Sequence, residues 1–406
     1  MTSRACHFSI GVRGIDGSWP EPPRTWSHSS LREATTCPRR WMLSRATYPG
    51  LWQGWGYPPR PSLPALLGDI VHRVLEVLVA TFSESGCTSL ADVEAVAVLK
   101  RLGGYSALAE RGIEEELAKL ADNPRISNDR IAQLRTALKI KVPEIRQRVQ
   151  AVMARTRFLP ASFEPEAEAS LSKRGPLPEG TYPEVELFSP DLRLMGRVDR
   201  LKVSEAGCEV TDYKTGAPDP HHAEQVRFYA LLWRHDRDLN PQGWLMRRLV
   251  LSYPSHDVEI APPTAQELDE LAATIGAQIT YAEAALRDRP PPAYPEATLC
   301  ALCDVRQLCD EYWTVRPGQL PDAGSAGSDW FDFEGTVIRR NGARSWLLAS
   351  TAKPDLLLRT ASETVPFEAG DRLRLLGLHR ETDEESPLPV GVLTQGGEIF
   401  FLGGAS

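Results

Sequence analysis

The stretch over residues 196–216 constrains this fold more than any other, because it predicts a β-hairpin that brings two carboxylates together. Its first strand, LRLMGRVDRLKV, alternates apolar and polar residues and carries Asp199. A turn follows at residues 205–207, and the second strand, CEVTDYKT, carries Asp212 and Lys214. Because residues two apart on a strand share a face, Asp212 and Lys214 are expected to point the same way.

Two acidic side chains beside one ammonium group suit a site for a hard divalent cation such as Mg²⁺ or Mn²⁺. The lysine can orient or deprotonate an attacking water, or neutralise charge on a phosphate. The alternative is a surface hairpin with solvated charges, which is the usual place of an Asp-x-Lys triplet. The rest of the chain has to decide between the two.

The composition bounds the kind of protein. A chain of 406 residues can form two domains, and 42% hydrophobic with 25% charged residues is ordinary for a globular protein. The net charge of −8 argues against a protein that coats nucleic acid by bulk electrostatics, although a local basic channel is compatible with it. Neither an apolar signal segment nor a membrane-spanning stretch is visible, so we expect a cytoplasmic protein without membrane contact.

The N-terminal part of the chain predicts helices. Residues 1–23 are expected to form a tail or an added strand, and the next helix is capped by Ser27 or Ser29 and ends near Cys37. The stretch LPALLGDIVHRVLEVLVATF has apolar residues at helical spacing and carries His72. A single histidine on a helix is usually a surface or core residue, and it gains functional meaning only if the helix points it at the hairpin carboxylates.

A further helical region is expected over residues 90–157, with a break or kink at Pro143. Its second half is strongly basic, which is typical either of a solvated helix face or of one wall of a nucleic-acid channel. Two arginines beside Trp41 add positive charge near the N-terminus. The basic residues predicted to contact DNA are Arg39, Arg40, Arg135, Lys139, Arg146 and Arg148.

The segments around the hairpin continue an α/β pattern. Upstream, FEPEAEASLSK places Glu164, Glu166 and Glu168 at the start of an expected strand, followed by a proline-rich loop. Downstream, HHAEQVRFYALLWRHD predicts a helix on which Gln225 and Tyr229 share a face. A strand over LMRRLVLSYPS and a long amphipathic helix over TAQELDELAATIGAQITYAEAALRD are expected next.

Three cysteines follow in a C-x2-C-x5-C array, at Cys300, Cys303 and Cys309. The array is a metal-ligand pattern with one member missing, since tetrahedral zinc and cubane iron–sulfur clusters both take four ligands. Metal binding is favoured over disulfides in a cytosolic chain. Cys37 lies beside a helix start and several arginines, so it is the candidate for the fourth ligand. A metal held by all four would tie the front of the domain to its back.

A linker over residues 317–328, rich in Gly, Ser, Ala and Pro, precedes a second unit. Residues 329–406 contain five strand-like runs with turns at 341–342, 370–371 and 396–397. This pattern predicts a small closed β barrel of the OB or SH3-like type. An OB barrel often binds single strands, but this one is net acidic, so docking onto another protein surface is the alternative.

Four motifs occur in the fixed order helix, hairpin, helix: LGDIVH, GRVD, DYKTG and QVRFY. In this order they resemble the PD-(D/E)XK nuclease superfamily, specifically its RecB-like branch. The cysteines resemble the iron–sulfur subset of that branch, found in AddAB-type helicase–nucleases and CRISPR-associated RecB-like exonucleases. The resemblance covers roughly residues 24–316. It implies a restriction-endonuclease-like mixed α/β sheet flanked by helices, followed here by the small OB-like barrel.

The resemblance also implies roles for individual residues. His72, Asp199 and Asp212 would bind Mg²⁺ or Mn²⁺ together with the backbone carbonyl of Tyr213, and Lys214 would position the attacking water. The family also has a glutamate upstream of the hairpin.

Glu168 fits the place of that glutamate best, with Glu166 as its rival. Gln225 and Tyr229 would hold the lysine or the substrate backbone. A structural 4Fe–4S cluster, with zinc as the alternative metal, would be held by Cys37, Cys300, Cys303 and Cys309.

Taken together, these features predict a metal-dependent DNA exonuclease that acts on single-stranded ends in repair, recombination or defence. The alternative is a catalytically idle nuclease fold that binds DNA or a helicase partner, although the retained carboxylates, lysine and histidine argue against it. The sequence has no GxxxxGK[ST] motif, so a helicase motor, if one is involved, would be a separate partner.

Overall fold

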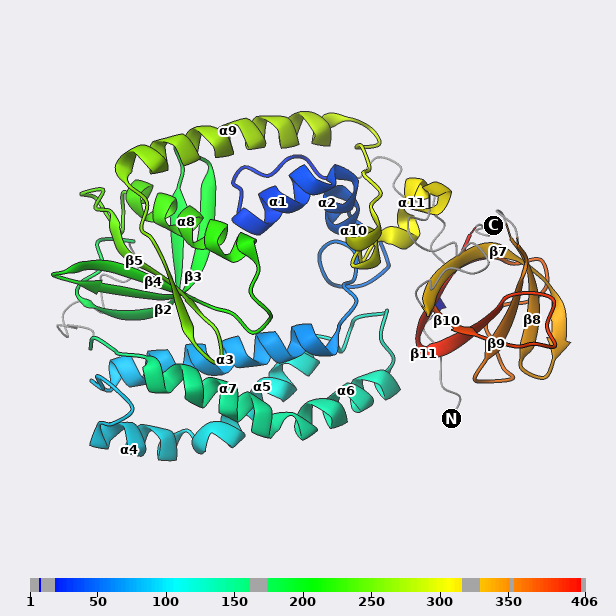
Figure 1. Cartoon of the computed structure of the whole chain (residues 1–406), viewed down its shortest axis with the longest axis horizontal. Coiled ribbons are helices and arrows are strands. Elements are labelled where there is room, and N and C mark those ends of the chain that lie inside the picture. The colour runs from blue at the N-terminus through cyan, green and yellow to red at the C-terminus, as the bar shows by residue number, and fades with distance from the viewer. Residues whose placement is uncertain (1–6, 9–18, 161–173, 316–328, 351–353, 403–406) are drawn as a thin grey trace.

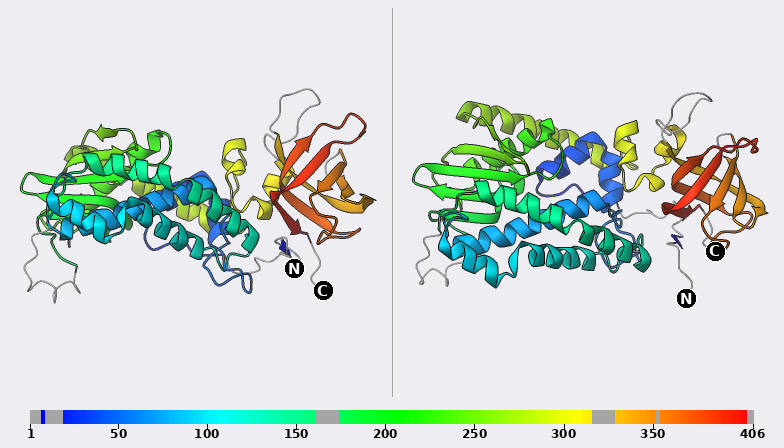
Figure 2. Two further views of the ribbon diagram at one scale, coloured as in Figure 1. Left: turned by 90° about the horizontal axis from the view of Figure 1, so that it is seen from below. Right: turned by 60° about the horizontal axis from the view of Figure 1, so that its bottom comes forward.

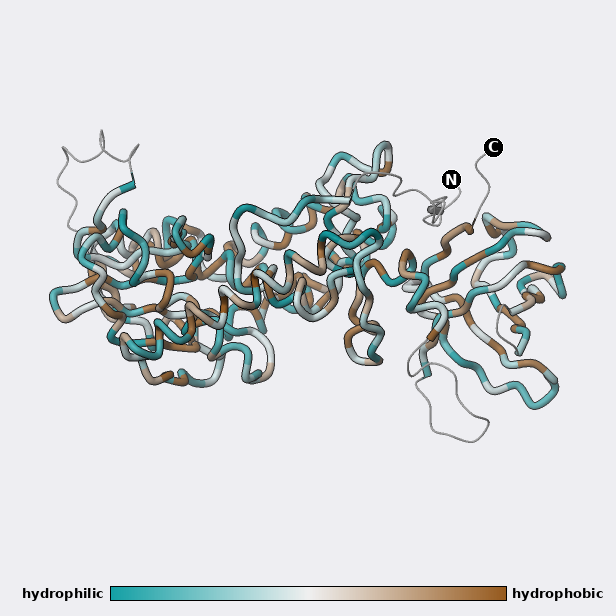
Figure 3. The backbone as a smooth tube through the Cα atoms, turned by 90° about the horizontal axis from the view of Figure 1, so that it is seen from above, coloured by the Kyte–Doolittle hydropathy of each residue, from teal (hydrophilic) through white to brown (hydrophobic). Residues whose placement is uncertain are grey.

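The computed structural model describes residues 7–8, 19–160, 174–315, 329–350 and 354–402. The molecule is elongated, with a five-stranded sheet and its helices at one end and a β barrel at the other (Figures 1 and 2). Each end has its own hydrophobic core, and Figure 3 shows hydrophobic positions recurring along both parts of the chain. Within the described ranges, no helix is both long and apolar enough to cross a bilayer.

The five-stranded sheet is mixed and contains the predicted hairpin at its centre. Its strands, in spatial order, are β2 (Gly180–Ser189), β3 (Leu194–Ser204), β4 (Gly207–Tyr213), β5 (Met246–Ser252) and β6 (Asp257–Ile260). The hairpin arms β3 and β4 pair in antiparallel register, with Arg200 opposite Thr211. The β4–β5 pair is parallel, because helix α8 (Pro220–His235) carries the chain back between them.

Strand β2 lies where we expected a proline-rich loop, and that expectation is wrong. The segment GTYPEVELFS pairs with β3 from Gly180 to Ser189. Pro183 is tolerated in the strand because β2 is at the edge of the sheet, where one row of backbone groups needs no partner strand. The strand therefore extends the hairpin to a three-stranded meander.

Helices cover the sheet on both sides (Figure 1). On one side, four helices share a core that includes Trp26 and Leu231, both fully buried. These helices are α1 (His28–Thr36), α2 (Pro38–Arg45), α8 and α9 (Ala265–Arg287).

The helices on the other side form a helical lobe with a separate core around Ile70 and Phe82. The region expected to be helical over 90–157 consists of four shorter helices. Pro143 stands in the first turn of the last one, where its missing N–H has no intrahelical partner to lose, so it begins a helix. The lobe comprises α3 (Leu63–Glu84), α4 (Val93–Arg101), α5 (Gly104–Ala118), α6 (Asn128–Ile140) and α7 (Val142–Arg155).

The C-terminal strands close into a ring, as predicted for a small barrel. They pair in the order β7-β8-β9-β11-β10 and back to β7. Residues 396–397, expected to form a turn, instead lie within the last strand opposite an irregularity in its neighbour. The short strand β1 (His7–Phe8) adds to β11 in parallel. The ring consists of β7 (Trp330–Gly342), β8 (Ser345–Ser350), β9 (Leu356–Thr360), β10 (Arg372–Glu381) and β11 (Val390–Phe401).

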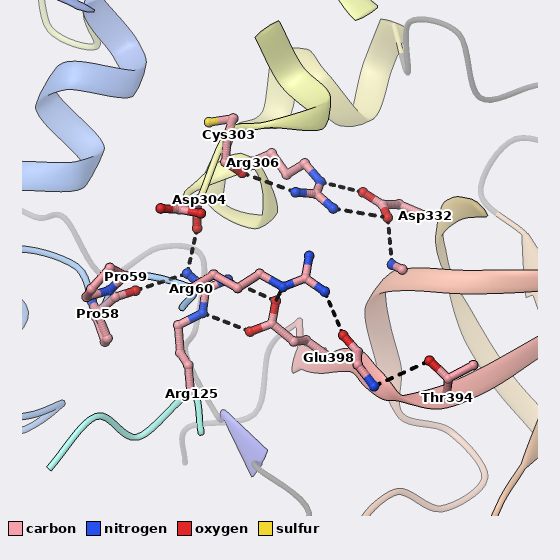
Figure 4. Close-up of polar contacts among 12 residues, drawn as sticks. Pro58, Pro59, Arg60, Arg125, Cys303, Asp304, Arg306, Asp332, Thr394 and Glu398 are labelled. Atoms are coloured by element: carbon pink, nitrogen blue, oxygen red, sulfur yellow. Dashed lines mark hydrogen bonds and ion pairs between the residues drawn. The ribbon is translucent and has the colours of Figure 1, made fainter. Parts of the chain in front are cut away.

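The barrel docks on residues 300–312, which we call the cysteine segment. This segment includes the end of α10 (Ala297–Ala301), a short 3-10 turn and the start of α11 (Asp310–Val315). Arg306 of the segment forms a buried ion pair with Asp332 of the barrel at 2.6 Å (Figure 4). Arg374 of the barrel donates in turn to the Gln307 carbonyl over 2.7 Å.

Candidate active site

Three acidic side chains stand in a row across three neighbouring strands. The register that pairs Arg200 with Thr211 makes Asp199 of β3 and Asp212 of β4 opposite neighbours. The register between β2 and β3 likewise puts Glu184 opposite Asp199. Residues directly opposite on antiparallel strands share a face, with Cβ atoms about 4.5–5.5 Å apart. Three carboxylates therefore meet on one small area of the sheet.

Helix α3 brings His72 to this row. The Nδ1 atom of His72 lies 3.5 Å from Oδ1 of Asp199, and its ring meets the Tyr213 ring edge-on with 6.2 Å between centroids. The other oxygen of Asp199 accepts a hydrogen bond from the backbone N–H of Tyr213. The imidazole on the helix and the two hairpin acids therefore meet, as the motif order predicted.

Lys214, just beyond the end of β4, connects the acids to helix α8. Its ammonium lies 2.6 Å from Oδ2 of Asp212 and donates to Oε1 of Gln225 over 2.8 Å. The amide of Gln225 then donates to the Tyr229 hydroxyl over 2.7 Å. The backbone N–H of Lys214 is held by the Ser252 carbonyl on the neighbouring strand. The position of the lysine is thus fixed from three directions.

Burial and a neighbouring charge make Asp212 and Glu184 hard to ionise. Burial, and next the charge of Asp199, raises the pKa of Asp212 to about 6, although Lys214 opposes the change. Burial and the same neighbouring charge raise the pKa of Glu184 to about 7. Burial lowers the pKa of His72, but its hydrogen bond to Asp199 and the nearby carboxylates outweigh this, so the net effect is a raised pKa. The site therefore holds protons close to neutral pH.

The donor set fits a hard divalent cation. Oδ2 of Asp212 is buried and, apart from the Lys214 ammonium beside it, has no hydrogen-bond partner, so a carboxylate lone pair is available for a cation. In the arrangement described, no group of three or more His, Cys, Asp or Glu side chains among the described residues forms a ready metal cluster. The acids contact the His72 and Tyr213 donors instead, and a cation would have to replace these contacts.

Two glycines allow the neighbouring helices to approach the hairpin. A Cβ atom on Gly196 would lie 2.9 Å from the Leu232 side chain and 3.0 Å from the Tyr229 ring. A Cβ atom on Gly68 of α3 would lie 3.0 Å from the Thr215 hydroxyl. Both distances are shorter than side chains normally tolerate, so these glycines let α8 and α3 close around the acidic row.

At the upstream glutamate, the structure offers a different residue from the ones predicted. Glu168 and its rival Glu166 both lie outside the described residues. Glu184, which sequence reasoning missed, occupies the position opposite Asp199. Its φ of +52° is unusual for a residue with a side chain and often marks functional sites. The signal that could have found it is the alternating segment TYPEVELF immediately before the hairpin, which Pro183 obscured.

The predicted basic contacts lie in different surroundings. Arg148 of α7 donates to the Thr215 carbonyl over 3.0 Å, so it reaches the end of the catalytic strand. Arg146 is exposed and has no ion-pair partner among the described residues. Arg135 and Lys139 both pair with Glu114 of the same lobe, at 3.0 and 3.6 Å. Of these four, Arg148 lies nearest the acidic row.

Arg39 is a structural residue, which contradicts its predicted contact with DNA. Only 7% of it is exposed, and its guanidinium is occupied by both carboxylate oxygens of Glu311 and by the Pro291 carbonyl. The neighbouring Arg40 pairs with Glu33 at 3.2 Å. The two arginines near Trp41 therefore form contacts within the protein, and Arg39 attaches α2 to residues 291 and 311.

The four predicted cysteine ligands do come together. Cys37, between α1 and α2, lines the same small cavity of about 20 Å³ as Cys300, Cys303 and Cys309. None of them is in a disulfide. Burial raises the pKa of Cys303 to about 11 and that of Cys309 to about 12, so these thiols are protonated unless a metal deprotonates them. The four thiols thus share one cavity, but among the described residues no three of them are arranged as a ready metal cluster, so the metal centre stays a prediction.

Comparisons with known proteins bear on the family of this chain. Residues 25–310 match the family model of the PD-(D/E)XK nuclease superfamily. No curated protein matches the sequence. Among solved structures, the crystal structure of the p204 HINb domain is similar over 22% of this chain, with 14% identity and a TM-score of 0.18. The match spans 49% of that domain, and at such a score it has no bearing on the fold.

Proposed function

Because the chain belongs to the PD-(D/E)XK nuclease superfamily, we propose that it is a Mg²⁺- or Mn²⁺-dependent nuclease that hydrolyses DNA phosphodiester bonds as an exonuclease on single-stranded ends. The observation that supports this most is the row of Glu184, Asp199 and Asp212 beside Lys214 and His72. Such an activity suits DNA repair, recombination or defence, with or without a separate helicase.

The cation would be held by the acidic row, with His72 and the Tyr213 carbonyl completing its surroundings. When bound, it would supply Lewis-acid stabilisation of charge on the phosphate and lower the pKa of a nearby water. Asp199 and Asp212 are presented by rigid paired strands, so the site needs no rearrangement of the backbone to receive a cation.

Lys214 would hold the attacking water or balance charge on the phosphate. Its contacts with Asp212 and Gln225 keep its ammonium group at the acidic row. Tyr229, through Gln225, fixes the lysine rotamer from the far side. Arg148 of α7 would contact the DNA backbone next to this site, because it donates to the Thr215 carbonyl just beyond Lys214. Arg146 of the same helix is exposed and has no ion-pair partner among the described residues, so it would add a second contact.

The cysteine cavity would hold a structural 4Fe–4S cluster, with zinc as the alternative. Three observations support a metal there: four thiols line one cavity, Cys303 and Cys309 are buried from solvent, and Arg40 lines the same cavity and offsets thiolate charge. Residues 24–316 would then form one nuclease unit, with 1–23 as a tail that adds a strand to the barrel, 317–328 as linker and 329–406 as the barrel domain.

Digestion of end-labelled single-stranded DNA with Mg²⁺ or Mn²⁺ tests the activity. The Asp212→Asn variant should lose at least about 100-fold in rate, because it removes a cation ligand, whereas the exposed control Asp122→Asn should match the parent. Substrates blocked at the 5′ end, blocked at the 3′ end, or circular separate exonuclease from endonuclease action. DNA binding without cleavage by the parent protein would instead mark a catalytically idle fold.

Elemental analysis tests the metal centre. We expect iron together with a brown colour, and the Cys303→Ser variant should lose the metal while Cys87→Ser, a buried cysteine outside the cavity, should retain it. Zinc without colour would select the alternative metal, and equal metal content in both variants would contradict the site.

A further inference from the structure

A large cleft lies between the helical lobe and the β barrel. Its volume is about 1120 Å³, which exceeds the roughly 300–1,000 Å³ of typical small-molecule sites. The lobe wall is formed at the N-terminal ends of α3 and α6, and the barrel wall by the loop after β9 and by the middle of β11. The polar residues that face it from the two walls include Arg60, Ser62, Ser127, Arg130, Ser362 and Thr394.

Buried ion pairs hold the two walls in place. Arg125 of the lobe donates to both carboxylate oxygens of Glu398 in the barrel, over 2.8 and 2.9 Å, with none of its own side chain exposed (Figure 4). The same guanidinium donates to the Asp304 carbonyl over 2.7 Å and to the Pro58 carbonyl over 3.0 Å. The cleft is therefore preformed, and a ligand would bind without ordering either wall.

The cleft offers donors for phosphates. Arg130 is exposed, contacts the Gln133 side chain and has no carboxylate partner among the described residues. Arg60 donates to the Gly396 carbonyl and lies 3.5 Å from the Glu398 carboxylate. That carboxylate also pairs with Arg125, so it offsets the charge of Arg60 only in part (Figure 4). Arginines, hydroxyls and backbone groups are the usual contacts of a nucleic-acid backbone.

Three carboxylates, Asp129, Asp304 and Glu398, also line the cleft, so its positive charge is modest. No aromatic side chain is among its described lining residues, so bases have no surface on which to stack. A strand bound here would be held through its sugar–phosphate backbone and not by its sequence.

The cleft lies in line with the candidate active site. Ser62, Leu63 and Ala65 of its lobe wall begin α3, the helix that carries His72. At about 1.5 Å per residue, His72 lies about 14 Å along this helix from Leu63. That span corresponds to about four nucleotides at the ~3.4 Å spacing of a stacked strand.

We infer that this cleft binds the backbone of single-stranded DNA extending from the catalytic site, independently of sequence. The inference rests on the proposed nuclease function and adds a second contact region for the same substrate. Oligonucleotides long enough to reach both regions then bind more tightly than those that fill only the first.

Fluorescence anisotropy of the full-length protein with labelled oligothymidylates of about 5 and about 20 nucleotides, in EDTA, measures this length effect. In the parent, the longer strand should bind about tenfold more tightly, and Arg130→Glu should remove most of that ratio. Arg130→Ala should reduce the slope of log K against log salt concentration for the long strand by about 0.7, the contribution of one phosphate contact on a single strand. The matched control is Arg111→Glu, an exposed arginine of α5 outside the cleft, which should leave the ratio as in the parent.

Substitutions of opposite charge on the barrel wall provide a second test. Ala361 is exposed and lines the cleft, so Ala361→Lys should tighten and Ala361→Glu should weaken binding of the long strand. Ala343→Glu, on an exposed turn of the barrel that is not part of the cleft lining, is the control. If the ratio of long-strand to short-strand affinity is the same in the cleft variants and the controls, the cleft does not bind the strand, and the nuclease proposal still stands. A parent that neither binds nor cleaves either strand would overturn both, and equal competition by duplex would overturn the single-strand preference.

Discussion

Glu184 and Asp199 face each other across the β2–β3 pair, and the backbone of Glu184 is in the left-handed region with φ of +52°. Such a conformation costs about 1–3 kcal/mol in a residue with a side chain and persists where the surroundings enforce it. Here the flanking residues Pro183 and Val185, which both pair with β3, enforce it. The Glu184 carboxylate lies near enough to Asp199 for that charge to raise its pKa, and its Oε2 lies 3.4 Å from Nε of Arg197.

The Glu184→Gln variant should weaken Mg²⁺ or Mn²⁺ binding about 10–100-fold and slow cleavage to match, because a cation site loses one of three carboxylates. Isothermal titration of the cation into the parent and the variant measures this. Glu168→Gln is the informative comparison, since that residue was the one expected from the sequence. A larger effect from Glu168 than from Glu184 would assign the third carboxylate to the earlier segment.

The stability of the cation-free protein should fall as the pH rises from about 4 to about 7. Glu184 and Asp212 have raised pKa values of about 7 and about 6 in the fold, so the folded state binds more protons than the unfolded chain in this window. His72, whose pKa is also raised, adds stability at low pH that is lost across its titration. Melting temperatures in EDTA across this range test the slope, and Mg²⁺ should stabilise more at pH 8 than at pH 5. Glu184→Gln should flatten the EDTA slope, and a parent curve that rises with pH would refute the assignment.

The Gly196→Ala variant should lower activity by displacing Tyr229. The new methyl group would meet the Tyr229 ring at 3.0 Å and the Leu232 side chain at 2.9 Å. Such overpacking costs about 1–3 kcal/mol, and it would release the contact from Tyr229 to Gln225 and so loosen Lys214. Gly276→Ala, on helix α9 with open space around it, is the control and should be neutral or slightly stabilising. Cleavage rates and urea midpoints of both variants test this prediction. An unimpaired cleavage rate in Gly196→Ala would show that Tyr229 does not position Lys214.

The Arg125→Met variant should destabilise the docked barrel by about 3–5 kcal/mol, because it leaves the carboxylate of Glu398 buried without its main partner. Arg60 is the nearest remaining cation, at 3.5 Å. The double variant Arg125→Met with Glu398→Leu should recover part of the loss, since a hydrophobic pair of similar volume often replaces a buried ion pair at little cost. Urea unfolding measures the effect, with Arg111→Met as the surface control. A double variant no better than the single one would show that the Arg125 contacts to Asp304 and Pro58 carry the energy instead.

Much of this molecule could be predicted from local patterns. The hairpin, the helix with His72 and the closed ring of C-terminal strands all follow from periodicity and turn residues, which act over short distances. No local pattern links Cys37 with Cys300; the link rested on the missing fourth ligand of the cysteine array and on the residues around Cys37, and the family resemblance supported it.

The errors have physical causes as well. Pro183 hid an edge strand, and with it Glu184, because a proline normally argues against a strand. Arg39 was expected to contact DNA, but it forms an ion pair with Glu311. The sequence does not show whether a long charged side chain is buried. The cleft between lobe and barrel has no sequence signal, since its walls come from five separate segments.

The cysteine segment touches every large part of the protein. Glu311 holds α2 through Arg39, the Asp304 carbonyl holds the lobe through Arg125, and Asp310 holds the barrel through Arg374. These thirteen residues thus act as a hub for the whole architecture. If this hub holds the proposed iron–sulfur cluster and oxidation removes its iron, the damage should first appear as a change in molecular dimensions, in elution volume or small-angle scattering, before any single domain melts. Preparations handled in air and under nitrogen should then differ in shape although their sequences are identical.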